Sequence, residues 1–584
     1  MTLRVSLLAA ALAFCISPLR SQELGVIEFP TSGSPAAQPL FIKGVLLMHS
    51  FEYDDAREAF VEAEKAEPGF AMAYWGEAMT FNHPIWQQTS PDLAKAALGR
   101  LAATPEARRA KARTEREKDW LGAVEKLYGA GDKLARDVAY ADAMKRMADK
   151  YPNDDEVKSF YALALLGTSH NGRDTAIYMK AAAIVEQVYA RNPQHPGAAH
   201  YLIHAYDDPA HAPLGLKYAD AYAKIAPAAS HALHMPSHIY VAMGMWDESA
   251  AINERSMKAA DERREARKLD VDQRGFHAML WLVYSYAEQG RIEEARNTLA
   301  QIDAAAKESG SVRTRSHLAL ARAAFLIETR KWGEVKAPVD AKDLPRDAVA
   351  AELFAIGFAG ARSGNRAQAA NAMQLMASLM QDAPENLAPV RSTPSSGASR
   401  PATAPVVPGP KAVLPPGVSP VAPAPAPSTQ APGTAISLPT AGAGGDMRVA
   451  QVMAQQLEAS MLFADGRREE ALVLARQAAI VESLLPFEFG PPNPVKPVNE
   501  LVGEMLMDLR RPKEAMEAFS LSLKRTPKRS LSLLGLARAA TLAKDPATAQ
   551  RAYGELNEIW KKADPTLPEL KEVATALAPK PSSR

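Results

Sequence analysis

Apolar residues recur along most of the chain with the spacing of amphipathic helices. From about Leu40 onward, Ala, Leu, Met and Tyr return every three to four positions, without the strict alternation of a strand. Short turns separate these stretches: a glycine or similar breaker, an aromatic residue or Arg, then an acidic pair and Ala. Such turns occur at 51–56, 244–250, 290–295 and 466–471. The pattern predicts an all-α protein built from helical hairpins.

The composition of these turns suits a repeated hairpin. Glycine ends the first helix in the left-handed conformation, and the acidic pair favours the start of the second helix through the helix dipole. Prolines close several units, at positions 68, 193, 227 and 527. The arrangement resembles the tetratricopeptide repeat, a helical hairpin of about 34 residues. We therefore expect an α-solenoid of tetratricopeptide-like hairpins.

One proline-rich segment breaks the helical pattern. Residues 384–446 contain fifteen of the 44 prolines, and only Arg400 and Lys411 carry charge between 392 and 445. Such a segment cannot form a core, so we predict a disordered linker, with a proline-rich ligand motif as the remote alternative. The predicted organisation is a signal peptide (1–21), an N-terminal segment (22–38), a helical array (39–383), the linker (384–446) and C-terminal hairpins (447–584).

The start of the chain has the features of an export signal. A short basic start precedes an apolar run over residues 5–16, which is shorter than the ~20 residues of a membrane span. We expect a periplasmic or secreted protein. Lipid anchoring is not expected, because bulky Phe14 precedes Cys15 where a lipoprotein signal needs a small residue. Cys15 is the only cysteine, so the mature chain has no disulfide or thiolate metal site.

The overall charge does not favour nucleic acid or membrane partners. The chain has 68 Lys and Arg against 67 Asp and Glu, a net charge of +1. A balanced chain has no bulk attraction to polyanions. We expect a protein or peptide partner, no nucleic acid and no transmembrane segment.

Histidines are concentrated in one part of the array. Seven of the 12 histidines lie between His195 and His238. His200 and His204 are four residues apart and share one helix face. His231, His234 and His238 follow a similar course, with Pro236 kinking that helix or marking its start. By the repeat register both segments are first helices of neighbouring hairpins, so their histidine faces can converge.

Converging imidazoles are suited to a transition metal such as Zn, Cu, Ni or Fe. The candidate ligands are His200, His204, His234 and His238. Further candidates for ligands or their supports are Asp207, Asp208, His211 and His231, and His83 and His170 are candidates for the same inner surface. The alternatives are that these histidines serve packing alone, or that they form a surface that gains charge near pH 6.

Several segments resemble a group of exported bacterial tetratricopeptide-repeat proteins. The resemblance rests on residues 70–79 and 82–84, on 200–209 (HYLIHAYDDP), on 231–240 (HALHMPSHIY) and on 530–540. It implies the same fold and export, and no particular activity. No nucleophile elbow, nucleotide-binding loop or HExxH sequence is present. Two functions therefore stay open: a binding scaffold with a histidine-rich site on its concave face, and a metal-dependent hydrolase or oxidoreductase on the same solenoid.

Overall fold

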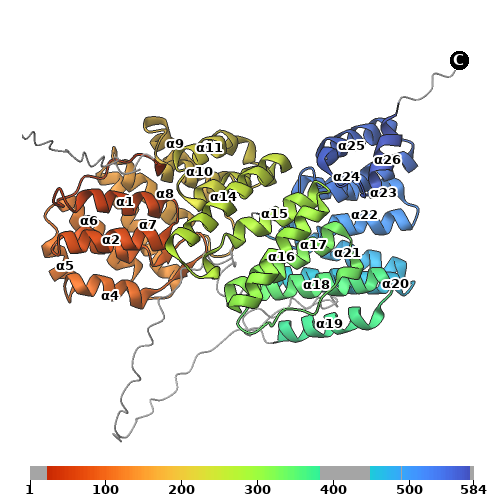
Figure 1. The fold of residues 1–584 in the computed structure, drawn as a ribbon, viewed down its shortest axis with the longest axis horizontal. Coiled ribbons are helices and arrows are strands. Elements are labelled where there is room, and N and C mark those ends of the chain that lie inside the picture. The colour runs from red at the N-terminus through yellow and green to blue at the C-terminus, as the bar shows by residue number, and fades with distance from the viewer. Residues whose placement is uncertain (1–22, 382–446, 488–489, 579–584) are drawn as a thin grey trace, which may run out of the picture.

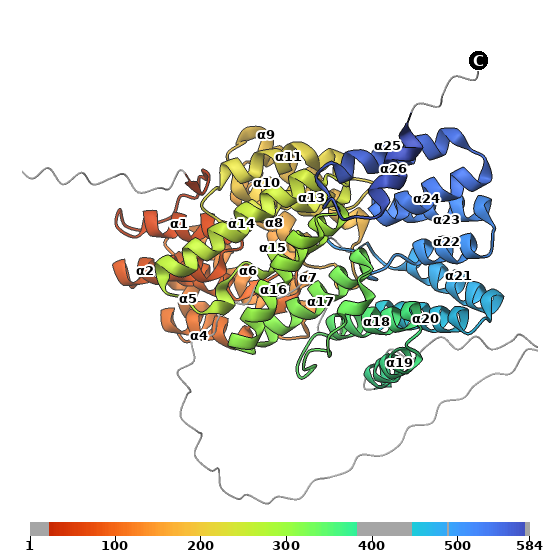
Figure 2. The same ribbon diagram turned by 45° about the vertical axis from the view of Figure 1, so that its right-hand side comes forward.

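The computed structural model describes residues 23–381, 447–487 and 490–578. Within these ranges the chain is almost entirely helical, and the only strands, β1 (Asn82–His83) and β2 (Gln88–Thr89), form a short antiparallel pair. Consecutive helices pack as antiparallel hairpins that stack into a curved array (Figures 1 and 2). The prediction of an α-solenoid is confirmed.

The N-terminal half of the array contains the following helices: α1 (Gln38–His49), α2 (Tyr53–Ala66), α3 (Ala71–Met79), α4 (Pro91–Leu101), α5 (Pro105–Lys111), α6 (Glu115–Leu127), α7 (Lys133–Lys150), α8 (Asp155–Leu166), α9 (Thr175–Arg191), α10 (Pro196–Tyr206), α11 (Ala212–Ile225), α12 (Ser230–His234), α13 (Pro236–Ala242) and α14 (Trp246–Arg267). The array continues with η2 (Val271–Gln273), α15 (Phe276–Glu288), α16 (Ile292–Ser309), α17 (Val312–Thr329), η3 (Trp332–Glu334), α18 (Arg346–Ser363) and α19 (Arg366–Gln381).

The hairpins resume after the proline-rich segment. The C-terminal helices are α20 (Met447–Ala464), α21 (Arg468–Leu484), α22 (Val498–Asp508), α23 (Pro512–Arg525), α24 (Ser530–Ala543), α25 (Pro546–Ile559), η6 (Trp560–Lys562) and α26 (Glu569–Leu577). Helix α20 packs against both α18 and α19, so the C-terminal hairpins extend the same stack. The whole of the predicted linker (384–446) and of the predicted signal peptide (1–21) lies outside the described residues.

The hairpin turns adopt the predicted left-handed conformation. Gly244, Gly290 and Gly466 have positive φ values of 64°, 68° and 86°. Phe51 occupies the equivalent place between α1 and α2 with a φ of 56°. A bulky residue pays a steric cost in this region of backbone space. Arg510 and Lys544 have similar φ values, 57° and 59°, at later hairpin turns, and the Phe51 ring lies beside the histidines described below.

The helix crossings follow a fixed register at both ends of the array. Gly44, Phe60 and Gly76 are spaced 16 residues apart, and the buried Phe60 ring fills the space that a Cβ on either glycine would need. Phe519 lies in the same way between Gly503 and Gly535, again in steps of 16. At both ends of the array, two successive first helices pack against one aromatic ring from the second helix that lies between them. The shared spacing indicates that these hairpins are copies of one unit.

The array curves until its C-terminal hairpins touch its middle. The indole nitrogen of Trp246 donates to the carbonyl of Lys528 at 3.1 Å, and the backbone of Asp564 donates to Gly290. The start of α24 also meets the end of α15, where the backbone nitrogen of Ser530 donates to the Glu288 carboxylate at 2.6 Å. The contacts place C-terminal residues over the histidine-rich region. Among the described helices, none has the length and apolar character that a membrane crossing requires.

Candidate metal centre

The repeat register brings the two histidine segments together. His200 and His204 lie on α10, while His234 ends α12 and His238 lies on α13. The separation is 34 residues for both pairs, 200 to 234 and 204 to 238, which is one tetratricopeptide period. Helices α10 and α13 pack against each other as first helices of successive hairpins, so equivalent positions meet. Pro236 begins α13 and separates it from α12.

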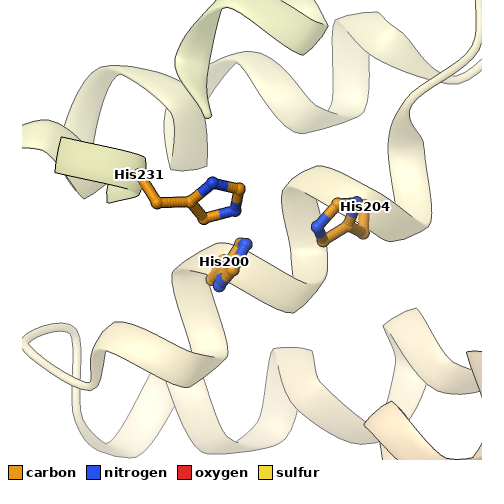
Figure 3. Close-up of side chains that lie close together, drawn as sticks. All are labelled: His200, His204 and His231. Atoms are coloured by element: carbon orange, nitrogen blue, oxygen red, sulfur yellow. The ribbon is translucent and has the colours of Figure 1, made fainter. Parts of the chain in front are cut away.

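A first group of imidazoles comprises His200, His204 and His231. One nitrogen from each ring lies within 4.8 Å of the other two. Figure 3 shows His200 and His204 on α10, with the ring of His231 pointing toward them from α12. Their exposed fractions are 0%, 3% and 4%. The group is thus enclosed in the protein interior.

A second group comprises His234, His238 and His277. Their ligand nitrogens also lie within 4.8 Å of one another, and His277 comes from α15, the first helix of the next hairpin. The Nε2 atoms of His234 and His238 face each other at 3.1 Å. Trp281 covers both rings, with centroid distances of 4.8 and 4.5 Å.

The two groups adjoin through His204, Asp207 and His238, whose ligand atoms again lie within 4.8 Å of one another. The four histidines expected as one ligand set are therefore divided between two groups. His231, expected in a supporting role, completes the first, and His277, which the sequence analysis missed, completes the second. We refer to these six histidines with Asp207 as the histidine cluster.

Acceptors behind the rings fix their orientation. Asp207 accepts a hydrogen bond from Nδ1 of His238 at 2.5 Å, and Asn253 Oδ1 accepts from Nδ1 of His234 at 2.7 Å. The Nδ1 of His200 donates to the backbone carbonyl of His49 at 2.6 Å. Metal-bound histidines characteristically donate their second ring nitrogen in this way.

Burial keeps five rings of the cluster uncharged. Loss of water lowers the pKa of the following imidazoles well below the ordinary value of 6.5, and neighbouring imidazoles lower it further: His200, His204, His231, His234 and His277. Neutral rings offer a nitrogen lone pair at pH 7, which is the form that binds metal.

Four of the predicted residues lie beside the cluster or away from it. Asp208 accepts from the backbone of Ala210 and His211 and pairs with Arg173, so it caps a turn that also holds His211. His170 pairs with Asp137 at 2.7 Å, away from the cluster.

His83 lies nearer, stacked on Tyr53 with a centroid distance of 4.0 Å. Burial lowers its pKa to about 4. It contacts Trp86, which in turn contacts His231.

A further buried group, which the sequence analysis missed, supports α10. His49 pairs with Glu156 at 2.8 Å, and Glu156 also pairs with His195 at 3.2 Å. Burial alone would raise the pKa of Glu156, but the facing His49 and His195 rings outweigh it and hold the pKa at about 2. The hydroxyl of Tyr201 donates to His49 Nδ1 at 2.8 Å. This network fixes the backbone carbonyl of His49, which accepts the hydrogen bond from Nδ1 of His200.

One signal in the sequence points to the histidines on the inside of the array. Histidines recur at the repeat period: 49 and 83, then 170, 204 and 238, and also 200 and 234, are each separated by 34 residues. Equivalent positions in successive first helices lie in a row along the inside of a solenoid. His277 does not follow His238 at this 34-residue spacing, because the long helix α14 lengthens its repeat.

A small cavity of about 30 Å³ adjoins the cluster. Asp207, His238 and Trp246 line one side, and Glu482 and Arg525 from the C-terminal hairpins line the other. Its volume leaves room for a water molecule. The wall of the cavity is therefore complete only when the C-terminal hairpins fold back over the array.

Fold and cluster together define an α-solenoid with an imidazole-rich interior. No protein-family model matches the chain, and no curated protein matches its sequence. Solved structures with some likeness include the crystal structure of the APC/C hetero-tetramer Cut9–Hcn1, at 10% identity over 94% of this chain and 78% of that chain, with a TM-score of 0.34.

A monomeric IFIT1 mutant with Gppp-AAAA has 12% identity over 84% of this chain and 90% of that chain, with a TM-score of 0.36. The human IFIT1 dimer with m7Gppp-AAAA has 12% identity, coverage of 94% and 92%, and a TM-score of 0.32. Likenesses this low carry no inference about what the present chain does.

Proposed function

We propose that this chain is an exported α-solenoid metalloprotein that holds a transition-metal ion at His234, His238 and His277. The ion presents an open coordination position toward the adjoining cavity. The observation that carries the proposal is the approach of two Nε2 atoms, those of His234 and His238, to 3.1 Å. Zn, Cu, Ni and Fe all suit imidazole ligands.

The hydrogen bonds behind these rings determine where their protons are. The amide nitrogen of Asn253 donates to the carbonyl of Ser249 at 2.9 Å, so its oxygen faces His234 Nδ1, which must carry the proton. Asp207 requires a proton on His238 Nδ1 in the same way. In the neutral rings both Nε2 atoms therefore carry lone pairs that point at each other.

Two facing lone pairs repel unless a cation lies between them. Zinc–nitrogen bonds of about 2.0–2.1 Å in a tetrahedral site place two nitrogens about 3.3 Å apart, close to the spacing found here. The competing explanation is a proton shared by the two rings, with His238 held as imidazolium by Asp207. A metal accounts in addition for the third ring, His277, whose Nδ1 has no hydrogen-bond partner among the described residues.

The adjoining cavity supports a reactive role rather than a purely structural one. His238 and Asp207 line it, so a metal at this site is next to a space that admits a water molecule. Structural zinc sites are closed by four protein ligands, whereas three histidines leave a position for water or substrate. The site therefore supports a metal-dependent hydrolase or oxidoreductase.

A separate groove favours a second function, the binding of a protein or peptide. It has a volume of about 430 Å³ and lies between α16, α17 and α18. Leu299, Phe325 and Ile356 provide an apolar floor, and Arg296 and Arg322 stand beside it, paired with Glu334 and Glu352 of the same groove. An extended segment with apolar side chains would suit this surface.

The decisive experiment is elemental analysis of protein purified without a histidine tag and then supplied with Zn²⁺, Cu²⁺, Ni²⁺ or Fe²⁺. We expect stoichiometric metal in the native chain and the loss of one equivalent in a His234→Ala/His277→Ala variant. His170→Ala, which removes a half-buried histidine away from the cluster, should keep the metal. A native chain that takes up none of these ions would favour the shared proton and overturn the proposal.

A further inference from the structure

His200, His204 and His231 have no role in the site just proposed, yet they form a comparable group. Within the described structure, the Nε2 atoms of His200 and His231 are buried without a hydrogen-bond partner. Leaving a buried polar atom unpaired is unfavourable for folding. Two such nitrogens converging on one point therefore require an explanation.

The first explanation to consider is that these rings serve packing alone. The ring of His200 does stack on Tyr222, with a centroid distance of 5.1 Å. Packing accounts for the ring carbons, but a phenylalanine or leucine side chain would pack as well without leaving a buried nitrogen unpaired. Packing also gives no reason for the hydrogen bond that turns His200 Nδ1 toward the His49 carbonyl and Nε2 toward the group.

Phe51 provides a second, independent observation. Its ring lies 4.3 Å from His200 and 5.5 Å from His231, centroid to centroid. The ring excludes water from the space that the three imidazoles surround.

A metal ion bound by His200 would also explain the buried hydrogen-bond network behind this ring. His49, Glu156 and Tyr201 together hold the carbonyl that accepts from His200. Gly197 allows this approach, because a Cβ there would come within 2.3 Å of the His49 ring. Outer acceptors of this type orient metal ligands and raise their affinity.

We propose that His200, His204 and His231 hold a second transition-metal ion. Three imidazoles with one open position are the donor set of catalytic zinc sites. The site extends the proposed function but needs no ion at the first site to exist. His204 and His238 have ring centroids 5.6 Å apart, and His231 and His234 are 6.0 Å apart, so the two ions are neighbours.

Metal titration of the full chain tests this inference. With Zn²⁺ we expect two ions per native chain, one in His200→Ala/His231→Ala and one in His234→Ala/His277→Ala. A native chain with a single ion that the His200→Ala/His231→Ala variant retains would overturn the second site and leave the first. A single ion lost only in that variant would support the second site and overturn the first.

A spectroscopic measurement on the native chain avoids any effect of the substitutions on folding. Cu²⁺ ions a few ångströms apart couple magnetically, so the second equivalent of Cu²⁺ should broaden or diminish the electron paramagnetic resonance signal of the first. Two equivalents that give twice the signal of isolated Cu²⁺ would show that the ions are not neighbours and would overturn the proposal.

Discussion

At the scale of single residues, the carboxylate that accepts a hydrogen bond from a candidate ligand histidine matters as much for metal binding as the histidine ring. Asp207 is 1% exposed and binds His238 through Nδ1, while its neighbour Asp208 caps a turn and pairs with Arg173. Two adjacent aspartates thus have separate tasks, and only one of them concerns the cluster.

This difference gives a test with a matched control. Asp207→Asn removes the charge that supports His238 as a ligand, so metal affinity should fall by about 10–100-fold. Asp208→Asn should leave the affinity close to that of the native chain. Competition with a chromophoric chelator measures both. Equal losses in the two variants would contradict the assignment of Asp207.

At the scale of helices, the fit between hairpins depends on glycine opposite a large ring. A Cβ on Gly76 would come within 2.3 Å of the Phe60 ring, which is itself packed against Gly44. Gly99 on α4 has nothing within 4 Å of such a Cβ. Gly76 therefore has no room for a larger side chain, whereas Gly99, in the same half of the array, does.

Alanine substitutions should move stability in opposite directions. Gly76→Ala forces α2 and α3 apart and should reduce the free energy of unfolding by about 1–3 kcal/mol. Gly99→Ala should raise it by up to about 1 kcal/mol, because glycine is a poor helix former. Urea unfolding monitored by circular dichroism measures both changes, and a neutral Gly76→Ala would refute this account of the hairpin packing.

At the scale of the whole molecule, a buried ionic network closes the array on itself. Arg529 in the C-terminal hairpins contacts Glu328 and Glu500 at 2.7 Å and Glu288 at 3.3 Å. Lys496 adds a second cation through Glu500. Three buried carboxyls thus share two cations, which favours retention of a proton.

Removal of the central cation should open the structure. Arg529→Ala leaves three buried carboxyls with too little positive charge and should cost about 3–5 kcal/mol in the free energy of unfolding. Arg538→Ala, at a pair with Glu572 where Arg538 is 40% exposed, should cost less than about 1 kcal/mol. Thermal unfolding and limited proteolysis of the C-terminal hairpins report the difference.

The same network predicts a dependence of stability on pH. Burial, with Glu288 and Glu500 nearby, outweighs the effect of Arg529 and raises the pKa of Glu328 to about 8, from 4.5 in the unfolded chain. A group with a raised folded pKa stabilises fully below its unfolded pKa, and that contribution is lost as pH rises through the folded pKa. Stability should therefore fall between about pH 5 and pH 8.

Glu328→Gln tests the assignment, because the amide has no proton to lose. The native melting temperature should drop by roughly 2–4 °C for each kcal/mol lost over this range, whereas the variant should change less. A variant with the same slope as the native chain would assign the pH dependence to other groups.

Much of the architecture could be read from the chain itself. Helical spacing of apolar residues and the turns at Gly244, Gly290 and Gly466 predicted the hairpins, because helix periodicity and left-handed turns are local properties. The proline-rich break was equally local. The histidine bias identified the right region, and the 34-residue spacing of His200 with His234 was available as a further signal.

Only the tertiary structure decided how the histidines are grouped. Which rings share a point depends on the packing of α10, α12, α13 and α15, and so on distances between helices that no local pattern contains. The same holds for His277, brought in by the next hairpin, and for the contact of the Phe51 ring with His200. The closing of the array through Arg529 also required contacts more than 200 residues apart along the chain, which arise from the summed curvature of many repeats.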